Sequence, residues 1–455
     1  MPTELKAGAL SLFESVVMGI AGSAPGYTIA VTTAVLLGTA GQLAPGALVI
    51  FAIPMLGIAV AYKALNRRHV NAGAAYQWTT IYFGRLFGFF SGWALLLASM
   101  IFMVTGSLPL ATATLDFVDP ALAENVVVSA AIASAWFLAV AVVLIVGIKV
   151  TSGVQVVMTM VELVILTVVV AAAFIHTAHV GPANPFSWSW FGFDYTAKSF
   201  AASALVVVFF YWGWDVTSNL GEETADGSEN AGHGGVVSVF VTIAYYIAFV
   251  FAALFLFNLS TAKGFNANII YNIAIATGLG RTGALFASAA VILSSIATLE
   301  TTMLQFSRSL FAMGRDGAMP VFFGTVDERT QTPVRAMLVL IGVGLLLVWG
   351  SSLMPTVHLI IQDSVNAVAV LVAYYYGLAG FAAAWAFRNL WRESLLNWIG
   401  LAVYPALSAF VLLILGAYAI TTFDLITKVV GIGGLVAGIV FFRPSRRITG
   451  APLQA

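Results

Sequence analysis

Residues Met18 to Ala30 read MGIAGSAPGYTIA and lie inside an apolar run that is otherwise long enough to span a membrane. Between Gly19 and Gly26 this stretch holds three glycines, one serine and one proline. In a helix interior, glycine costs about 1 kcal/mol and proline about 3 kcal/mol relative to alanine. The stretch therefore predicts a membrane helix that stops midway and starts again.

The composition of the whole chain is that of a membrane protein. Of its 455 residues, 61% are hydrophobic and only 8% are charged, which favours a polytopic, all-α membrane domain. The 19 basic and 19 acidic residues balance, so no charge excess points to a nucleic-acid partner. Without cysteine the chain has no disulfide, thiol nucleophile or thiolate-bound metal, and we expect no cofactor.

Scanning for runs of roughly 20 apolar residues predicts about twelve membrane spans in one domain, residues 1–455. The first run has no cleavage site for a signal peptidase, so we expect it to be retained. The predicted spans are 12–37, 44–64, 86–114, 126–148, 153–178, 199–222, 234–258, 282–312, 335–354, 357–387, 397–421 and 424–442.

The basic residues sort to one side of these spans. With a cytoplasmic N-terminus, 15 of the 19 fall on the inner side, and only Lys198, Lys263, Arg281 and Lys428 fall outside. Inner loops of membrane proteins carry such an excess. We therefore expect a multi-pass protein of the cell membrane with both termini in the cytoplasm.

Two short motifs match known binding patterns but are better explained without a bound ligand. GLGRTG at residues 278–283 matches a dinucleotide-binding pattern, but it has no surrounding β-α-β unit and lies at a predicted span boundary. His176 and His179 have metal-ligand spacing, yet no acidic or cysteine partner is near in sequence. We expect neither a nucleotide nor a metal site.

A second interrupted helix begins the other half of the chain. Phe209 to Asp215 reads FFYWGWD, with one glycine among five aromatic residues. Two broken helices five spans apart predict two inverted repeats, at 12–178 and 199–387, followed by two further helices at 397–442. Transporters of this construction bind substrate at the breaks, where backbone N–H and C=O groups are exposed at mid-membrane depth. The alternative is that these glycines only allow close helix packing.

Five acidic residues lie in or near predicted spans: Glu14, Glu162, Asp215, Glu300 and Asp363. A charge at a helix centre costs about 2.5–3.5 kcal/mol on insertion scales. Glu14 and Asp363 lie near span ends, which favours an interfacial role. Glu162 and Glu300 have apolar or small neighbours, and each is a protonatable group, a counter-ion for a basic substrate or one partner of an internal hydrogen bond.

Four stretches together resemble the amino acid-polyamine-organocation (APC) superfamily over most of the chain. They are the break at Gly22 to Pro25, the segment Phe209 to Asp215 with the distal pair Glu222 and Glu223, SRSLFAMGRDGAMP at 307–320, and NAGAAYQWTTIYFGRLFGFFSGW at 71–93. The third is the most specific. The resemblance implies an amino acid permease with the leucine-transporter fold, two inverted five-helix repeats plus two helices.

The resemblance also implies which residues bind substrate and which couple transport to an ion. The substrate-binding set lies at the two breaks: Ile20, Ala21, Gly22, Ser23, Ala24, Gly26, Phe209, Tyr211 and Trp212. For coupling to an ion, the first choice is Asp215, followed by Glu162 and Glu300. The alternative for Asp215 is a carboxylate that caps local backbone donors.

This sequence departs from its relatives at three places. Ala24-Pro25 replaces the last glycine of the break, and we expect the N–H groups of Ser23, Ala24 and Gly26 to stay free for a substrate carboxylate. Glu162 takes the place of a lysine that some relatives carry in the fifth helix. The segment GEETADGSENAGHGG, residues 221–235, is acidic where relatives are basic.

We therefore predict a secondary active transporter, not an enzyme, that moves an amino acid by alternating access with proton-coupled symport or exchange. H⁺ or Na⁺ is the expected coupling ion. The alternative within the family is a carrier of polyamines or other organic amines, because the intramembrane acids outnumber the bases. A channel is disfavoured, since no selectivity-filter sequence is evident. An enzyme is disfavoured because the sequence offers no recognisable set of catalytic residues.

Overall fold

The computed structural model describes residues 4–115, 117–263 and 268–442. Within these ranges the regular structure is helical, with one isolated β-bridge between Leu10 and Thr224. The longer helices are α1 (Leu12–Ser23), α2 (Pro25–Ala40), α3 (Ala44–Arg68), α5 (Arg85–Leu115), α6 (Val126–Val146), α7 (Ile148–Val180), α8 (Ala197–Phe210), α10 (Gly227–Leu256), α13 (Gly280–Arg315), α14 (Val334–Ser351), α15 (Val357–Ala386) and α17 (Tyr404–Thr422).

Short helices and turns connect these elements. The short α-helices are α4 (Ala75–Phe83), α9 (Val216–Asn219), α11 (Leu259–Lys263), α12 (Ile269–Ala276), α16 (Leu395–Trp398), α18 (Leu425–Thr427) and α19 (Gly434–Ala437). Two π-helical turns, Ile399–Val403 and Lys428–Gly433, join α16 to α17 and α18 to α19. The 3₁₀ turns are Gly41–Leu43, Pro120–Glu124, Trp188–Phe191, Gly221–Glu223, Val321–Phe323, Leu390–Arg392 and Gly438–Val440.

Every predicted span overlaps a helix. By length and composition, nine helical stretches of the described chain could cross a membrane, and the first, Leu12–Arg68, contains two predicted spans. The predicted spans 199–222 and 424–442 fall on shorter apolar helices, Ala197–Phe210 and Leu425–Val440. The count of twelve crossings therefore stays a prediction, as does the inverted relation of the two halves.

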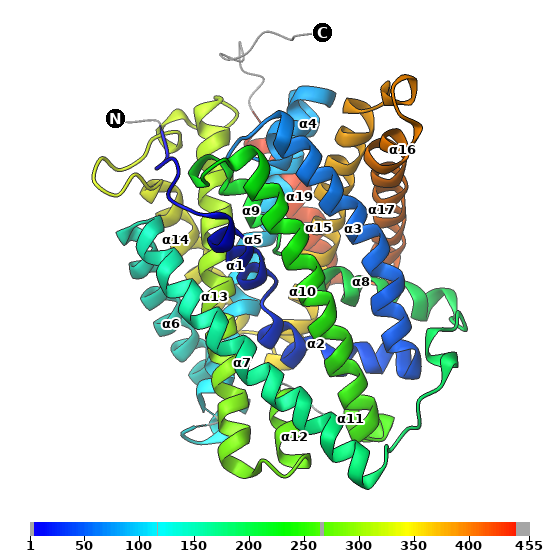
Figure 1. Cartoon of the computed structure of the whole chain (residues 1–455). Coiled ribbons are helices and arrows are strands. Elements are labelled where there is room, and N and C mark those ends of the chain that lie inside the picture. Colours follow the sequence, from blue (N-terminus) through cyan, green and yellow to red (C-terminus); the bar gives the residue numbers. More distant parts are fainter. Residues whose placement is uncertain (1–3, 116, 264–267, 443–455) are drawn as a thin grey trace.

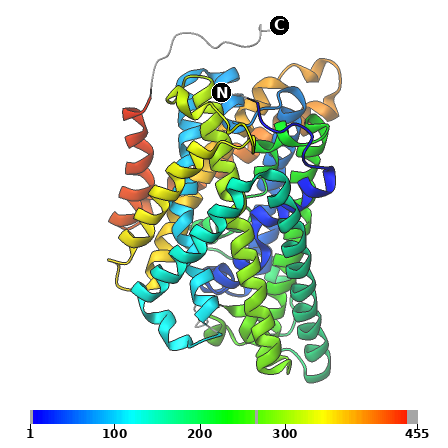
Figure 2. The same ribbon diagram turned by 90° about the vertical axis from the view of Figure 1, so that its left-hand side faces the viewer.

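The helices form one upright bundle with the first break at its centre. Figure 1 shows α1 and α2 in the middle of the bundle, and α1 packs against α7, α10 and α13. The two ends of the described chain lie at the same end of the bundle (Figures 1 and 2), as an even number of crossings requires. Three arginines that support the inner-side count, Arg443, Arg446 and Arg447, lie outside the described residues.

Glu14 has a structural role at the start of α1. Its carboxylate accepts the Ser11 N–H at 2.8 Å, and the Ser11 hydroxyl accepts the Glu14 N–H, which completes a capping box. Lys149 Nζ lies 2.7 Å from Glu14 Oε1. These contacts give Glu14 a structural role at the start of α1, and its position at the membrane interface stays a prediction.

Candidate site at two helix breaks

The first helix break is at Ala24, between α1 and α2. Ala24 has a left-handed backbone, φ 46° and ψ 70°, which costs a non-glycine residue roughly 1–2 kcal/mol. Hydrogen bonds hold the freed carbonyl groups: Thr298 Oγ1 donates to Gly22 O at 3.1 Å, and Tyr246 Oη donates to Ser23 O at 2.8 Å. Pro25, as the first residue of α2, restarts the helix with a preset φ. The predicted interruption is confirmed.

The second break separates α8 from α9 and touches the first. A Cβ added to Gly22 would lie 2.2 Å from Gly213 O, and one added to Gly213 would lie 2.2 Å from Gly22 O. Gly213 also has φ +102°, a conformation that favours glycine. The two broken helices therefore cross backbone to backbone, a contact that only two glycines allow.

The N-terminus of α2 is already occupied by a carboxylate of the protein. Glu162, on α7, is fully buried, and its Oε1 accepts the Gly26 N–H at 2.8 Å. Ala24 N–H donates to Ile20 O at 2.8 Å. The expectation of free donors was therefore wrong for Ala24 and Gly26, because Glu162 fills the position in which a helix N-terminus would hold a substrate anion.

The second oxygen of Glu162 has no such partner. Oε2 is buried without a hydrogen bond of ordinary length from the described residues, and the polar group that faces the carboxylate is the Ser294 hydroxyl of α13, itself buried without a partner. Along α7, Gln155 and Thr159 share the face of Glu162, since they lie seven and three residues before it. Gln155 Oε1 and Thr159 Oγ1 are likewise buried without a partner in the described chain. Buried polar atoms are normally paired. The unpaired oxygens on this face of α7 could therefore bind a proton, a cation or an ammonium group.

Aromatic side chains form a layer beside the two breaks. The rings of Phe209 and Trp212 are 6.3 Å apart, and Phe102 of α5 packs edge-on against Trp212 at 5.1 Å. Tyr27 of α2 adds a fourth ring, 6.5 Å from Phe209. Sequence reasoning identified Phe209 and Trp212 but missed Phe102 and Tyr27, because their sequence contexts differ little from those of core aromatics.

Tyr211 points elsewhere. Its hydroxyl donates to Leu48 O at 3.1 Å, and its ring packs on Tyr246 at 5.7 Å. It therefore lies apart from the aromatic layer. The other predicted residues of the first break, Ile20 and Ala21, are buried in α1.

Asp215 lies at the end of the second break, fully buried. Tyr376 Oη donates to its Oδ1 at 2.9 Å. Tyr375 Oη and Gln305 Nε2 donate to its Oδ2 at 3.0 and 2.7 Å. Every side-chain donor is neutral, and they come from α13 and α15 instead of the local backbone, which argues against the local-cap alternative. Trp212 Nε1 also donates to Tyr375 Oη, at 2.6 Å, so the network connects Asp215 to the aromatic layer.

Glu300 is not part of this arrangement. Thr298 of α13 reaches the first break, and Glu300 follows it by two residues. In an α-helix, two residues correspond to a rotation of roughly 200°, so the two side chains leave on different faces. Glu300 is 1% exposed, and its Oε2 has no hydrogen bond from the described residues.

A cavity of about 290 Å³ lies between α2, α8, α15 and the α17–α18 connection. Val206, three residues before Phe209, lines it, as does Thr32, five residues after Tyr27. Its described lining contains two carboxylates, Asp363 and Asp424, and no lysine or arginine. The cavity next to the aromatic layer is therefore acidic.

Two ion pairs join the segment after α9 to α13. Arg308 donates from Nε and Nη2 to the two carboxylate oxygens of Glu223, both at 2.8 Å, and both side chains are fully buried. Arg315 pairs with Glu222 at 2.7 Å, and Glu222 also accepts the Ala72 N–H at 2.8 Å. The family-like segments around residues 71–93, 222–223 and 307–320 thus meet in space.

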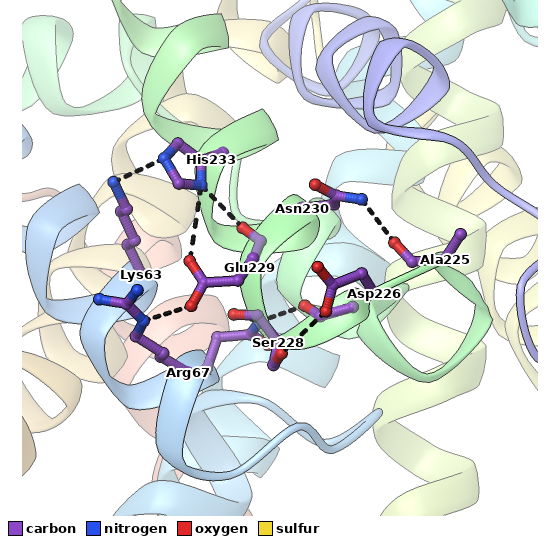
Figure 3. A network of polar contacts seen from close by, with 10 residues as sticks. Lys63, Arg67, Ala225, Asp226, Ser228, Glu229, Asn230 and His233 are labelled. Carbon is purple, nitrogen blue, oxygen red and sulfur yellow. Dashed lines mark hydrogen bonds and ion pairs between the residues drawn. The ribbon is translucent and has the colours of Figure 1, made fainter.

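The acidic segment 221–235 continues into α10 and binds α3, as Figure 3 shows. Arg67 forms an ion pair with Glu229, and Lys63 Nζ lies 3.0 Å from His233 Nε2. Within the segment, Asn230 donates to Ala225 O at 2.7 Å. Glu229 of this segment therefore pairs with a basic residue of α3 on an exposed part of the surface, whereas Glu222 and Glu223 pair with α13.

Comparisons with known proteins agree with this architecture. The family model described as "Amino acid permease" matches residues 10–442. The cationic amino acid transporter 4 of Arabidopsis thaliana, a vacuolar protein, is 26% identical over 346 residues, 72% of this chain and 56% of its own length. The chain therefore spans little more than half of that relative.

Two bacterial relatives are covered more fully. The low-affinity putrescine importer of Escherichia coli strain K12 is 26% identical over 357 residues, 74% of each chain. The methylthioribose transporter of Bacillus subtilis strain 168 is 26% identical over 346 residues, 72% of each chain. Together with the apolar helices, these similarities indicate a multi-pass membrane permease for small molecules.

Proposed function

Because this chain belongs to the amino acid permease family of the APC superfamily, we propose that it is a secondary active transporter that moves a small organic amine by alternating access. Its substrate is held between the breaks at Gly22 to Gly26 and Phe209 to Asp215. The aromatic layer packs against the apolar part of the substrate, and the aromatic faces attract its ammonium group.

The observation that carries this proposal is Glu162 at the N-terminus of α2. A substrate carboxylate would compete with Glu162 for the Gly26 N–H. An ammonium group, in contrast, gains a buried carboxylate oxygen that lacks a partner in the described chain. The acidic cavity beside the aromatic layer has the same charge preference. This geometry favours the amine alternative over a zwitterionic amino acid.

An amino acid is the second candidate, because the family model and the Arabidopsis relative are both named for amino acids. In that case Glu162 leaves the Gly26 N–H when the substrate carboxylate arrives. A cationic amino acid could then pair its side chain with Glu162.

Coupling to an ion is assigned first to Asp215. Its partners Tyr375, Tyr376 and Gln305 are all neutral, so the carboxylate can take up H⁺ without leaving a charged partner unpaired. Glu162 is the second choice, for H⁺ or Na⁺. Glu300 stays a weaker proposal because it lies away from the breaks.

We place this transporter in the cell membrane with twelve spans, inverted repeats at 12–178 and 199–387, and both termini in the cytoplasm. The excess of basic residues on one side supports this orientation. Both ends of the described chain lie at the same end of the bundle, which supports an even number of spans.

Uptake by proteoliposomes tests the function. Purified protein is screened for thermal stabilisation by putrescine, lysine and leucine, and the best ligand is then used for uptake and counterflow. We expect putrescine to stabilise most, lysine less and leucine least. Stabilisation by leucine but not by putrescine would select the amino acid candidate. Flux that neither saturates nor exchanges with internal substrate would exclude a carrier.

Glu162→Gln tests the role of the carboxylate directly. The amide oxygen of glutamine still accepts the Gly26 N–H, so only the charge is removed. We expect at least a tenfold loss of putrescine affinity, about 1.4 kcal/mol. Glu393→Gln, at an exposed carboxylate, is the matched control and should bind as wild type. Equal affinity in both variants would contradict the assignment of Glu162.

A further inference from the structure

A groove lined only by apolar side chains lies where α4 and α5 meet α15. Its volume is about 460 Å³. The six residues that line it are Phe83, Phe87, Leu378, Phe381, Ala384 and Trp385. Two of its walls face outward, since Phe87 is 50% and Trp385 52% exposed. In a membrane protein such a surface is in contact with lipid acyl chains.

Guanidinium groups gather at the end of α15 that adjoins this groove. The Arg388 guanidinium lies over the Trp385 ring, 4.6 Å from its centroid, and Trp385 is itself a wall of the groove. Arg68 of α3 lies over Phe387 at 4.0 Å, and Arg392 lies over Trp391 at 5.3 Å. The basic cluster therefore borders the apolar groove.

These guanidinium groups retain hydrogen-bonding capacity. Among the described residues, Arg388 forms no ion pair, and the one hydrogen bond of its side chain runs from Nη1 to Trp385 O at 2.8 Å. A guanidinium has five N–H donors, so most of those of Arg388 are available. Between residues 385 and 398 the only acid is Glu393. Over the same residues, Arg388 and Arg392 against one carboxylate leave an excess of positive charge, to which Arg68 of α3 adds at Phe387.

We propose that this groove and the basic cluster bind an anionic phospholipid, with one acyl chain in the groove and the phosphate on Arg388. The apolar lining has no polar group to satisfy, so it suits an acyl chain and not a free phosphate ion. The stacked guanidinium suits a phosphate oxygen, because Arg can donate two parallel N–H groups to it. Basic sites beside helices on the cytoplasmic side of membrane proteins are suited to anionic headgroups.

Native mass spectrometry of the full-length, delipidated protein tests this proposal. Phosphatidylglycerol and phosphatidylcholine with identical acyl chains are added separately, and the lipid retained per protein is counted. We expect one phosphatidylglycerol to be retained at least tenfold better than phosphatidylcholine. Inorganic phosphate in excess should not displace it. Equal retention of the two lipids would overturn the proposal, and displacement by phosphate would assign the site to the free ion.

Two variants and a control locate the site. Arg388→Gln should reduce phosphatidylglycerol retention to the level of phosphatidylcholine, and Ala384→Trp, which fills the groove, should abolish it independently. Arg329→Gln removes an exposed arginine from the α13–α14 connection and should leave retention unchanged. If all three variants retain phosphatidylglycerol as wild type does, or all three lose it equally, the groove is not the binding site.

Discussion

Asp215 and Glu223 lie eight positions apart on one connected segment and are equally buried, yet their carboxylates have opposite kinds of partner. Glu223 receives two hydrogen bonds from the guanidinium of Arg308. Asp215 receives hydrogen bonds from two tyrosine hydroxyls and one amide. The first is a charge-neutral pair, whereas the second is an acid among neutral donors.

This difference decides which of the two buried acids can change its charge state without leaving a cation unpaired. In the Glu223–Arg308 pair, protonating the carboxylate would leave a buried guanidinium uncompensated, so its charge state is fixed. At Asp215 no cation loses its partner when the charge changes. The same segment therefore fastens α9 to α13 at one end and provides a group that can change its charge state at the other.

Removing the cation of the buried pair should have the largest effect. In Arg308→Ala, Glu223 stays buried without its guanidinium, and we expect the free energy of unfolding to fall by about 3–5 kcal/mol. Thermal and denaturant unfolding in detergent measure the change. Arg329→Ala, at an exposed site, is the control. A loss below about 1 kcal/mol for Arg308→Ala would show that the pair does not hold these helices together.

A substitution where the two helix breaks cross should have the second largest effect on stability. Gly213→Ala places a Cβ 2.2 Å from Gly22 O, a backbone atom that cannot move alone. We expect about 1–3 kcal/mol of destabilisation together with a loss of uptake of at least tenfold, because both breaks must shift. Gly38→Ala in α2, where an added Cβ meets nothing within 4 Å, should be neutral in both assays.

Asp215→Asn should affect transport more than stability. Asparagine keeps the shape: its amide oxygen can accept from Tyr375 and Gln305, and its amide N–H can donate to the Tyr376 hydroxyl, so we expect a loss of roughly 1 kcal/mol. If Asp215 is the coupling group, uptake loses its response to a pH gradient while binding is retained. Glu223→Gln provides the contrast, with a larger loss of stability. An unchanged pH response in Asp215→Asn, but a lost one in Glu162→Gln, would move the coupling role to α7.

The exposed contacts in Figure 3 should contribute least. Arg67→Ala removes the Arg67–Glu229 ion pair, in which the Arg67 side chain is 65% exposed. Exposed ion pairs contribute at most about 1 kcal/mol, and salt should remove that contribution. Unfolding measured at low and high salt tests this. A salt-independent loss as large as that of Arg308→Ala would overturn the distinction between buried and exposed pairs.

Much of the helical framework was predictable from local sequence. Each predicted span meets a helix, because a run of apolar residues signals membrane burial whatever its neighbours are. The first break was predicted because glycine and proline act locally on the backbone. The Gly22–Gly213 contact was not, since each glycine is explained within its own helix and only the packing of the two shows why both lack a Cβ.

The partners of the acids were least predictable. Asp215, Glu162 and Glu300 look alike in sequence, as acids in apolar surroundings. Their environments differ because helical register directs each to another face, and because the partners of Asp215 lie 90, 160 and 161 positions away. The expectation of free donors at α2 was wrong for the same reason, since Glu162 reaches Gly26 across 136 positions.

The sequence by itself determined that this chain spans a membrane, that its first helix breaks at Ala24-Pro25, and that it belongs with the APC transporters. Local propensity, hydropathy and contiguous motifs carry that information. Only the tertiary structure decided that the broken helix presents its N-terminus to Glu162, and that one buried acid is paired with a guanidinium while another is not. Those partners are brought together by helix packing, because charge and hydrogen bonding depend on distance in space and not on distance along the chain.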